Sequence, residues 1–460
     1  MFKKLLNWLF GRKPAMPAPA PSGFETLNRQ APLRKAQAAS TEPQGAPHEI
    51  GATYICREAI LNRQQKIAGY QFLLQAAALH HIRNSSRRVH HLYAEVLVNS
   101  LVHANIGSLL GPRAAFIDVP DSFLDHECIS RLPPANMVLV PVRLSDAGAP
   151  SPEALAATIR RLRSQGYNIG LPDPRSEPEY AHLLALANVV FIRASRLSAD
   201  QALALTAEIA DKAPQAVLLA RDLPGLEDFS FCYKMGCGLF QGPFITSRED
   251  WRDHQLGPNF TRLAVLAGKL RSQADTGDVV AMLKQDAALT VRLLRYINSA
   301  ANGLPEHVSS IERALILLGR DRLYRWVMLL MCSSDAQEGR ASAVLETALV
   351  RARMMELTGT NQQAAERETL FLTGLLSLID VILKVPMARA MNTLGVTSDI
   401  EAAILRGEGA LGARLKLAQA SEGSDPDALR TAAEACGIAP EDAARCQMEA
   451  LAWALDMQRA

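Results

Sequence analysis

The sequence predicts a multidomain protein in which an α/β half is followed by an all-helical half. Short apolar segments recur about every 20 to 30 residues between positions 115 and 241, with helix patterns between them. Beyond residue 340, almost every segment has the three- and four-residue apolar spacing of a helix. The length of 460 residues exceeds what one hydrophobic core usually covers, so we expect two domains with appendages.

Residues 1–48 are expected to form a flexible N-terminal arm. Residues 1–13, MFKKLLNWLFGRK, combine large apolar side chains with four basic ones. A short helix of this kind can lie on an anionic membrane surface, and the alternative is a frayed start that docks on the chain's own surface. The segment lacks the cleavage site of a secretory signal. Residues 14–48 are rich in Pro, Ala, Gln and Ser, which predicts a flexible linker.

The α/β half begins near residue 50 and alternates between strand and helix patterns. Strand–helix repeats of this length favour parallel strands with crossover helices. The periodicity leaves open whether the strands close into a barrel or form an open sheet. Expected helices cover residues 90–108, 152–164, 179–187 and 199–212. Expected strands cover residues 54–61, 65–74, 115–120, 137–142, 168–171, 189–194, 216–220 and 238–241.

The helical half contains a segment, residues 283–323, with well-defined helix starts and ends. Asp286 is a good N-cap for a helix whose apolar face ends at Asn298. Ser309 begins a capping box for a second helix, which ends at Gly319. Further helices are expected over residues 344–358, 366–383, 426–436 and 440–457.

The residues at these helix ends resemble the HDOD domain. A generic pair of capped helices explains the leucines of this segment but not the Asn-Ser-Ala joint. The resemblance implies an all-helical domain over residues 251–460, related to the HD phosphohydrolases but without their metal-binding histidines and aspartates. The matching positions include Asp286, Leu289, Asn298, Ser299, Ala300, Ser310, Ala314 and Gly319.

A second resemblance covers about residues 50–250 and is clearest at the two ends of that range. Arg57-Glu-Ala-Ile-Leu, Gly69-Tyr-Gln-Phe-Leu-Leu-Gln and Phe240-Gln-Gly are similar to segments of the EAL domain. The resemblance implies a TIM-type barrel over residues 49–250, with the site at the C-terminal ends of the strands. Intact members of that family hydrolyse cyclic di-GMP. An EAL-like barrel followed by an HDOD domain is a familiar bacterial pairing, so each resemblance supports the other.

The positions of the EAL site carry an altered set of residues in this sequence. The resemblance places the signature glutamate on neutral Gln71, an asparagine ligand on Asp118 and half of an Asp-Asp pair on Asp173. The strand at residues 138–143, which should supply a glutamate, has no acid. The full set of site positions is Gln71, Gln75, Asp118, Pro172, Asp173, Arg193 and Arg221.

This altered set is short of negative charge. The EAL reaction uses a pair of divalent cations to activate water against a phosphodiester, and such ions are held by several carboxylates. Asp118 and Asp173 are the only plausible ligands left, and we expect Arg193 and Arg221 to face them. We therefore expect no catalytic residues, no metal site and no cofactor, which describes a degenerate EAL barrel and a pseudoenzyme.

The sequence thus favours a bacterial signal-transduction adaptor that is not an enzyme and that binds other signalling proteins. Its place in a cyclic di-GMP or stress-response circuit is implied by the family resemblance alone. The alternative is a non-hydrolysing cyclic di-GMP sensor, because Arg193 and Arg221 could bind phosphate groups. An active phosphodiesterase is the third hypothesis, and the missing acids argue against it.

Charge and cysteine content bear on partners and location. A net charge of +2 gives no general attraction to nucleic acid, so we expect no nucleic-acid partner. Seven scattered cysteines suit a reducing compartment, and no apolar run reaches the roughly 20 residues that span a bilayer. We expect a cytoplasmic protein, with peripheral membrane contact through residues 1–13 as an added option.

Overall fold

The computed structural model describes residues 55–74, 86–144, 148–193, 197–251, 255–272, 274–298, 308–334, 339–359, 362–423 and 426–458. The chain divides into two compact units. The larger unit combines residues 52–279 with residues 319–456, and the smaller unit includes residues 280–318. The expected arm, with its membrane-contacting residues 1–13, lies outside the described residues, as do Gln75, Ser299 and Ala300. The predicted domain bounds 49–250 and 251–460 stay predictions.

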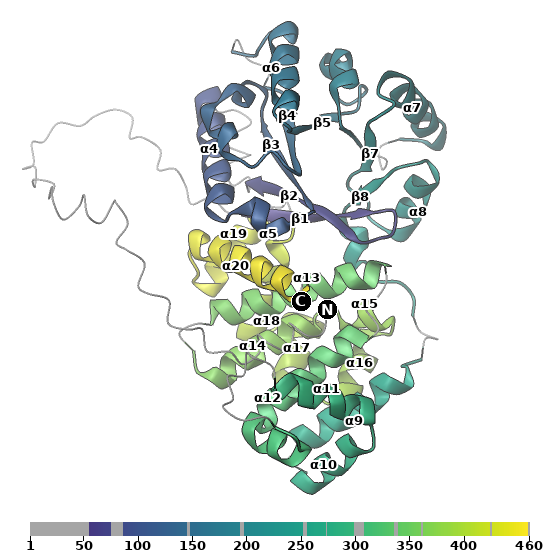
Figure 1. Cartoon of the computed structure of the whole chain (residues 1–460), viewed down its shortest axis with the longest axis vertical. Helices are drawn as coiled ribbons and strands as arrows, with labels where there is room; N and C mark the ends of the chain where they lie inside the picture. Colours follow the sequence, from purple (N-terminus) through teal and green to yellow (C-terminus); the bar gives the residue numbers. More distant parts are fainter. Residues whose placement is uncertain are drawn as a thin grey trace, which may run out of the picture. The chain divides into compact units, whose positions relative to one another are not determined.

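Eight strands close into a barrel in sequence order, which confirms the expected barrel (Figure 1). Consecutive strands from β2 to β8 are parallel to one another, whereas β1 is antiparallel to both of its neighbours, β2 and β8. β1 and β2 are antiparallel because only residues 63–66 join them, and a parallel pair needs a crossover of a dozen or more residues. The strands are β1 (Ile55–Asn62), β2 (Ile67–Leu74), β3 (Ala114–Pro120), β4 (Met137–Val142), β5 (Asn168–Pro172), β6 (Val189–Ile192), β7 (Val217–Ala220) and β8 (Leu239–Gln241).

Helices connect the parallel strands of the barrel. At the start of α7, Ser198 and Gln201 form a capping box, in which the Ser198 Oγ accepts from the Gln201 N–H at 3.3 Å. The expected α-helix over residues 179–187 is instead a 3₁₀ segment, η3, which suits a short connection between β5 and β6. The connecting elements are α4 (Arg87–His103), α5 (Ile106–Leu110), η1 (Asp121–Asp125), η2 (Glu127–Arg131), α6 (Pro152–Ser164), η3 (Pro178–Leu186), α7 (Ala199–Lys212), α8 (Leu226–Lys234) and η5 (Pro243–Thr246).

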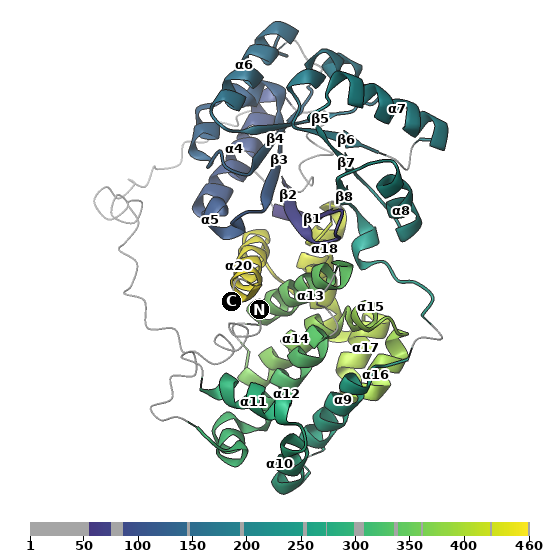
Figure 2. The same cartoon turned by 45° about the vertical axis from the view of Figure 1, so that its right-hand side comes forward.

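The remaining chain is helical, as predicted. Helices α13 and α14 lie side by side in the larger unit (Figure 2). The single helix expected over residues 366–383 is divided, because Leu378 leaves helical geometry between α14 and α15. The helices are α9 (Pro258–Arg271), α10 (Thr276–Lys284), α11 (Ala287–Ile297), α12 (Ile311–Ser334), α13 (Gly339–Thr358), α14 (Ala364–Leu376), α15 (Ile379–Leu383), α16 (Met387–Leu394), α17 (Ser398–Arg406), α18 (Gly409–Ala420), α19 (Pro426–Cys436) and α20 (Pro440–Gln458).

The smaller unit explains the asparagine of the Asn-Ser-Ala joint. The Asn298 Nδ2 donates to the Val308 carbonyl at 2.7 Å, and the Asn298 Oδ1 accepts from the Val308 N–H at 2.7 Å. The single Asn298 side chain therefore satisfies both the N–H and the carbonyl of Val308. Asp286 caps α11 as predicted, accepting from the Leu289 N–H at 2.9 Å.

The second predicted helix start needs a correction of one residue. The Ser310 Oγ, rather than that of Ser309, accepts the Arg313 N–H at the start of α12. The predicted end of this helix at Gly319 is confirmed as a kink inside α12, where φ is 74°. Glycine adopts this left-handed conformation without steric cost.

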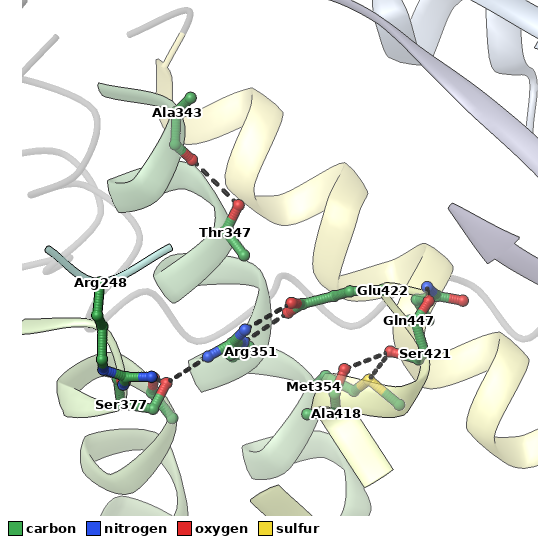
Figure 3. A network of polar contacts seen from close by, with 11 residues as sticks. Arg248, Ala343, Thr347, Arg351, Met354, Ser377, Ala418, Ser421, Glu422 and Gln447 are labelled. Carbon is green, nitrogen blue, oxygen red and sulfur yellow. Dashed lines mark hydrogen bonds and ion pairs between the residues drawn. The ribbon is translucent and has the colours of Figure 1, made fainter. Parts of the chain in front are cut away.

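Polar contacts join the barrel sequence to the helices within the larger unit. The Arg113 guanidinium donates to both carboxylate oxygens of buried Glu346, at 2.8 and 3.0 Å. Among the helices, Arg351 donates to both oxygens of Glu422 at 2.7 Å and to the Ser377 Oγ at 3.1 Å (Figure 3). Charged groups buried in this way are stable only when they are paired and hydrogen-bonded.

No helix in the described part of the chain is long and apolar enough to cross a lipid bilayer.

Candidate functional site at the barrel mouth

The side chains that point into the barrel form an apolar layer beneath a polar one. The apolar layer includes Ile60, Phe116, Phe191 and Leu219, which pack in one buried cluster. Because side chains two positions apart share a face of a strand, the next inward positions toward the open end are Glu58, Asp118, Arg193 and Arg221. This open end, where β2 to β8 finish and antiparallel β1 begins, is called the mouth. We define the mouth layer as Glu58, Gln71, Asp118, Arg193, Arg221 and Gln241.

Two buried amides connect the carboxylates of the mouth layer. The Gln241 Nε2 donates to the Glu58 Oε2 at 2.5 Å and to the Gln71 Oε1 at 2.8 Å. The Gln71 Nε2 in turn donates to the Asp118 Oδ1 at 2.8 Å. The order Glu58–Gln241–Gln71–Asp118 is called the amide chain. Its four residues lie on β1, β8, β2 and β3, which are neighbours around the closed barrel. The amide chain therefore holds both carboxylates in fixed positions.

Asp118 lies at one end of the amide chain beside a cation. Burial raises the pKa of the Asp118 carboxyl, while Arg221 and the Gln71 hydrogen bond act in the opposite direction without cancelling the rise. The Arg221 Nη2 lies 3.6 Å from the Asp118 Oδ1, which is an ion pair too long for a hydrogen bond. Asp118 is therefore a carboxyl group whose charge is only partly compensated.

The raised pKa of Asp118 predicts a pH-dependent effect of Asp118→Asn. A carboxyl group with a raised folded-state pKa stabilises the fold below its ordinary value of 3.8, and this contribution is lost as the pH rises through the raised pKa. Asparagine keeps an acceptor for Gln71 and does not titrate. The variant should therefore gain thermal stability relative to the wild type as the pH rises above about 4. Thermal unfolding followed by circular dichroism tests this, and a Tm difference that does not change with pH would contradict it.

Arg221 is positioned by an aromatic ring and keeps donors unused. Its guanidinium carbon lies 3.7 Å from the centre of the Phe191 ring, a stacking contact between a cation and a π-system. The Arg221 Nε and Nη2 are buried and have no hydrogen-bond partner within the described residues. Buried donors without partners are costly, so this guanidinium is a favourable place for an anionic ligand.

Gly170 makes room for the ring under Arg221. A Cβ atom at position 170 would lie 2.6 Å from the Phe191 Cε2 and 3.2 Å from the Val140 Cγ2. The ring fills the space that any larger residue at this position would need. The glycine in β5 therefore decides where the Phe191 ring lies, and through it the Arg221 guanidinium.

Gly170→Ala is expected to destabilise the protein by about 1–3 kcal/mol, because an added methyl group must displace Phe191 in a packed barrel interior. Chemical denaturation measures the change. Gly268→Ala is the matched control, since a Cβ atom there meets nothing within 4 Å and alanine is favoured in helix α9. Equal stability of Gly170→Ala and the wild type would show that Phe191 is not held in this way.

Arg193 lies at the end of the neighbouring strand, β6. Its Nε is 3.4 Å from the Oδ2 of Asp222, and both side chains are largely exposed. Asp222 has a φ of 58°, an unusual conformation for a residue other than glycine. Strained residues of this kind gather at functional loops, and this one directly follows Arg221. The structure thus brings the two predicted arginines to one mouth, as expected.

The two predicted aspartates do not form a metal site. The Asp173 carboxylate is bound within its own loop, where it accepts hydrogen bonds from the Arg175 N–H, the Ser176 N–H and the Ser176 hydroxyl. Asp118 is occupied by Gln71 and Arg221. No group of three His, Cys, Asp or Glu residues within the described ranges could hold a metal ion. The residues present therefore do not fit the cation pair that the EAL resemblance implies.

The helical half offers no second candidate at the stretch around Ser377 and Asp380. The buried Asp380 carboxylate pairs with the Arg248 guanidinium, whose Nη2 also lies 3.4 Å from the Ser377 carbonyl. The Ser377 hydroxyl donates to the Gly374 carbonyl at 2.7 Å and accepts from Arg351. Both side chains are thus engaged in polar contacts with other residues, and Figure 3 shows the contact between Ser377 and Arg351.

Comparison with known proteins agrees with this architecture. The HDOD domain family matches residues 262–403. The cyclic di-GMP phosphodiesterase CdgJ of Vibrio cholerae is 24% identical over 412 residues, which is 88% of this chain and 93% of that protein. The uncharacterized protein YuxH of Bacillus subtilis is 22% identical over 411 residues, 87% of this chain and 97% of that protein. An EAL domain protein from Listeria monocytogenes has 13% identity and a TM-score of 0.34, with 42% of this chain and 87% of that chain covered.

The fold defines the class as a closed α/β barrel whose sequence is followed by helices. The helical part contains a match to the HDOD domain family over residues 262–403, as the sequence resemblance predicted.

The expectations of a catalytically inactive adaptor and of a protein that is not an enzyme are wrong and are corrected here. A relative that aligns over 88% of this chain is named a cyclic di-GMP phosphodiesterase, so the term pseudoenzyme is not supported. The physical fault lay in counting acids only at aligned positions. Glu58, directly opposite Gln71 in the β1–β2 ladder, was missed, although it stands in the quoted Arg57-Glu-Ala-Ile-Leu segment.

Proposed function

We propose that this protein acts on cyclic di-GMP, binding the dinucleotide at the mouth layer and hydrolysing a phosphodiester bond. The observation that carries the proposal is the alignment with CdgJ, which spans both halves of this chain and nearly the whole length of that protein. The proposed function includes the assignment of residues 49–250 to the catalytic barrel and of residues 251–460 to the HDOD domain.

The mouth layer supports binding of a dinucleotide with two phosphates. Arg221 and Arg193 follow adjacent strands, and guanidinium groups bind phosphate through paired hydrogen bonds. Two nitrogens of Arg221 are buried without a hydrogen bond in the described structure, although Nη2 forms the long ion pair with Asp118, so a phosphate oxygen would satisfy them. The Arg221 side chain is held by Phe191 before any ligand arrives, which reduces the entropy lost on binding.

A cytoplasmic location is part of this proposal. The cysteines whose side chains are described, among them Cys128 and Cys332, are free thiols, which suits a reducing compartment. Other signalling proteins are proposed as partners of the HDOD domain.

The test is turnover by the full-length protein. Purified protein is incubated with cyclic di-GMP in buffer containing Mg²⁺ or Mn²⁺, and the nucleotides are separated by chromatography. We expect conversion of the cyclic dinucleotide into a linear one. Cyclic di-GMP that is neither bound in calorimetry nor converted after prolonged incubation would show that the proposal is wrong.

A further inference from the structure

Arg57 carries a buried positive charge on the outer face of β1. Side chains alternate along a strand, so Arg57 lies on the opposite face from its neighbour Glu58, which belongs to the mouth layer. Only 5% of Arg57 is exposed, and its guanidinium carbon lies 5.0 Å from the centre of the Tyr70 ring on β2. The Arg57 Nε is buried and has no hydrogen-bond partner within the described residues. Because a guanidinium keeps its proton in proteins, Arg57 brings both a charge and an unsatisfied donor into the interior.

Two ion pairs lie close enough to Arg57 to act on its charge, and each is already complete. Glu346, which is only 1% exposed, accepts hydrogen bonds from two nitrogens of Arg113 at 2.8 and 3.0 Å. Arg351 donates to both oxygens of Glu422 at 2.7 Å (Figure 3). Each carboxylate is therefore bound by the two-pronged hydrogen bonding of another arginine. The five residues Arg57, Arg113, Glu346, Arg351 and Glu422 are called the junction cluster, and all of them belong to the larger unit.

The junction cluster has more positive than negative charge, because it combines three guanidinium groups with two carboxylates. Burial lowers the pKa of Arg57, and the attraction of Glu422 and Glu346 does not cancel this effect. A buried charge that lacks its own counter-charge is costly. A ligand with one negative charge that accepts the Arg57 Nε–H would remove both the excess charge and the unsatisfied donor.

We propose that the junction cluster is a binding site for a small inorganic anion of the chloride type, which the Arg57 guanidinium holds. A halide ion carries no proton and accepts N–H donors from any direction, so it adds no unsatisfied donor of its own. A water molecule would satisfy the Arg57 Nε but would leave the excess charge in place. The bound anion would join β1 to α13, which carries Glu346 and Arg351, and would stabilise the larger unit by binding only its folded form. The site lies on the outer face of β1 and is separate from the mouth layer.

Thermal unfolding of the full-length protein in chloride tests this inference. Sodium gluconate, whose anion is too large for such a site, replaces sodium chloride at constant ionic strength, so that general charge screening does not change. The Tm of the wild type should rise by about 2 °C for each ten-fold increase in chloride above its dissociation constant. Arg57→Met removes the guanidinium but keeps a long side chain, and it should abolish this dependence. Arg430→Met, which removes an exposed guanidinium on α19, is the control and should keep the dependence of the wild type.

Two results would overturn the anion site. A wild-type Tm that is the same in chloride and in gluconate would mean that no anion binds, and a chloride dependence that Arg57→Met keeps in full would place the anion elsewhere. If Arg57→Met does not fold, crystals of the wild-type protein soaked in bromide decide. An anomalous peak within hydrogen-bonding distance of the Arg57 guanidinium is the expected result, and the absence of a peak there would contradict the inference. Neither measurement depends on cyclic di-GMP, so the anion site and the proposed function stand or fall separately.

Discussion

Replacing Arg325 by methionine is expected to lower the free energy of unfolding by about 3–5 kcal/mol, because buried Glu356 and half-buried Glu368 both lose this cation. The Arg325 Nη1 donates to the Glu356 Oε1 at 3.1 Å and to the Glu368 Oε2 at 2.6 Å. The guanidinium carbon lies 3.4 Å from the centre of the Phe371 ring. These contacts tie α12, α13 and α14 together inside the larger unit.

The two carboxylates differ in how well they are compensated. Burial acts to raise the pKa of Glu356, but Arg325 and Arg353 outweigh it and leave that pKa lowered. Burial raises the pKa of Glu368, and Arg325 alone does not reverse the rise. Removal of Arg325 should therefore be less harmful at acidic pH, where both acids can become neutral.

Chemical denaturation followed by circular dichroism measures the loss. Arg430→Met is the matched control, because Arg430 forms an exposed ion pair with Glu434 along α19 and such pairs contribute about 0–1 kcal/mol. The triple variant Arg325→Met with Glu356→Gln and Glu368→Gln should recover part of the loss, since it also removes the two negative charges that Arg325 compensates. A loss for Arg325→Met no larger than that of the control would show that the cluster does not stabilise the helices.

Arg221→Ala is expected to weaken cyclic di-GMP binding about 100-fold, which corresponds to about 2.8 kcal/mol at about 1.4 kcal/mol per ten-fold change. The reason is the loss of the only mouth arginine that is both stacked on a ring and supplied with unused buried donors in the described structure. Arg221→Lys keeps the charge but not the forked geometry, so it should fall between the wild type and Arg221→Ala.

Isothermal titration calorimetry with the full-length protein measures these affinities. Arg161→Ala, which removes an exposed guanidinium on α6 paired with Asp125, is the control and should bind like the wild type. Equal affinities of Arg221→Ala and Arg161→Ala would mean that the phosphates are bound elsewhere.

The sequence predicted most strand positions, because buried parallel strands are short apolar runs with a recognisable spacing. It could not decide barrel closure. Closure depends on the pairing of Ile60 with Gln241, which are far apart in the chain and have no local signal for one another. The reversal of β1 could have been anticipated, since residues 63–66 leave room only for a hairpin.

The candidate site was predicted in part. Asp118, Arg193 and Arg221 were expected at the strand ends and do lie in the mouth layer. Asp173 was expected beside them, but strand alternation gives the inward position to Pro172 and turns Asp173 into its own loop. Position-by-position comparison treats each strand separately, whereas a site is built from side chains that neighbouring strands bring together.

The position of Glu58 opposite Gln71 also could not be predicted from the sequence. Its importance depends on its register with Gln71, and that register includes an irregularity between Ile60 and Leu61 that no sequence pattern indicates. The stacking of Arg221 on Phe191 likewise depends on Gly170. The sequence does not show that a larger side chain at this position would collide with the Phe191 ring.

The central claim is that cyclic di-GMP occupies the mouth layer of the barrel. Hydrogen–deuterium exchange of the full-length protein with and without saturating cyclic di-GMP tests it most directly. We predict slower exchange in peptides that cover residues 189–193 and 217–225, which carry Arg193 and Arg221. Unchanged exchange in both segments, with protection only in other parts of the chain, would contradict the claim.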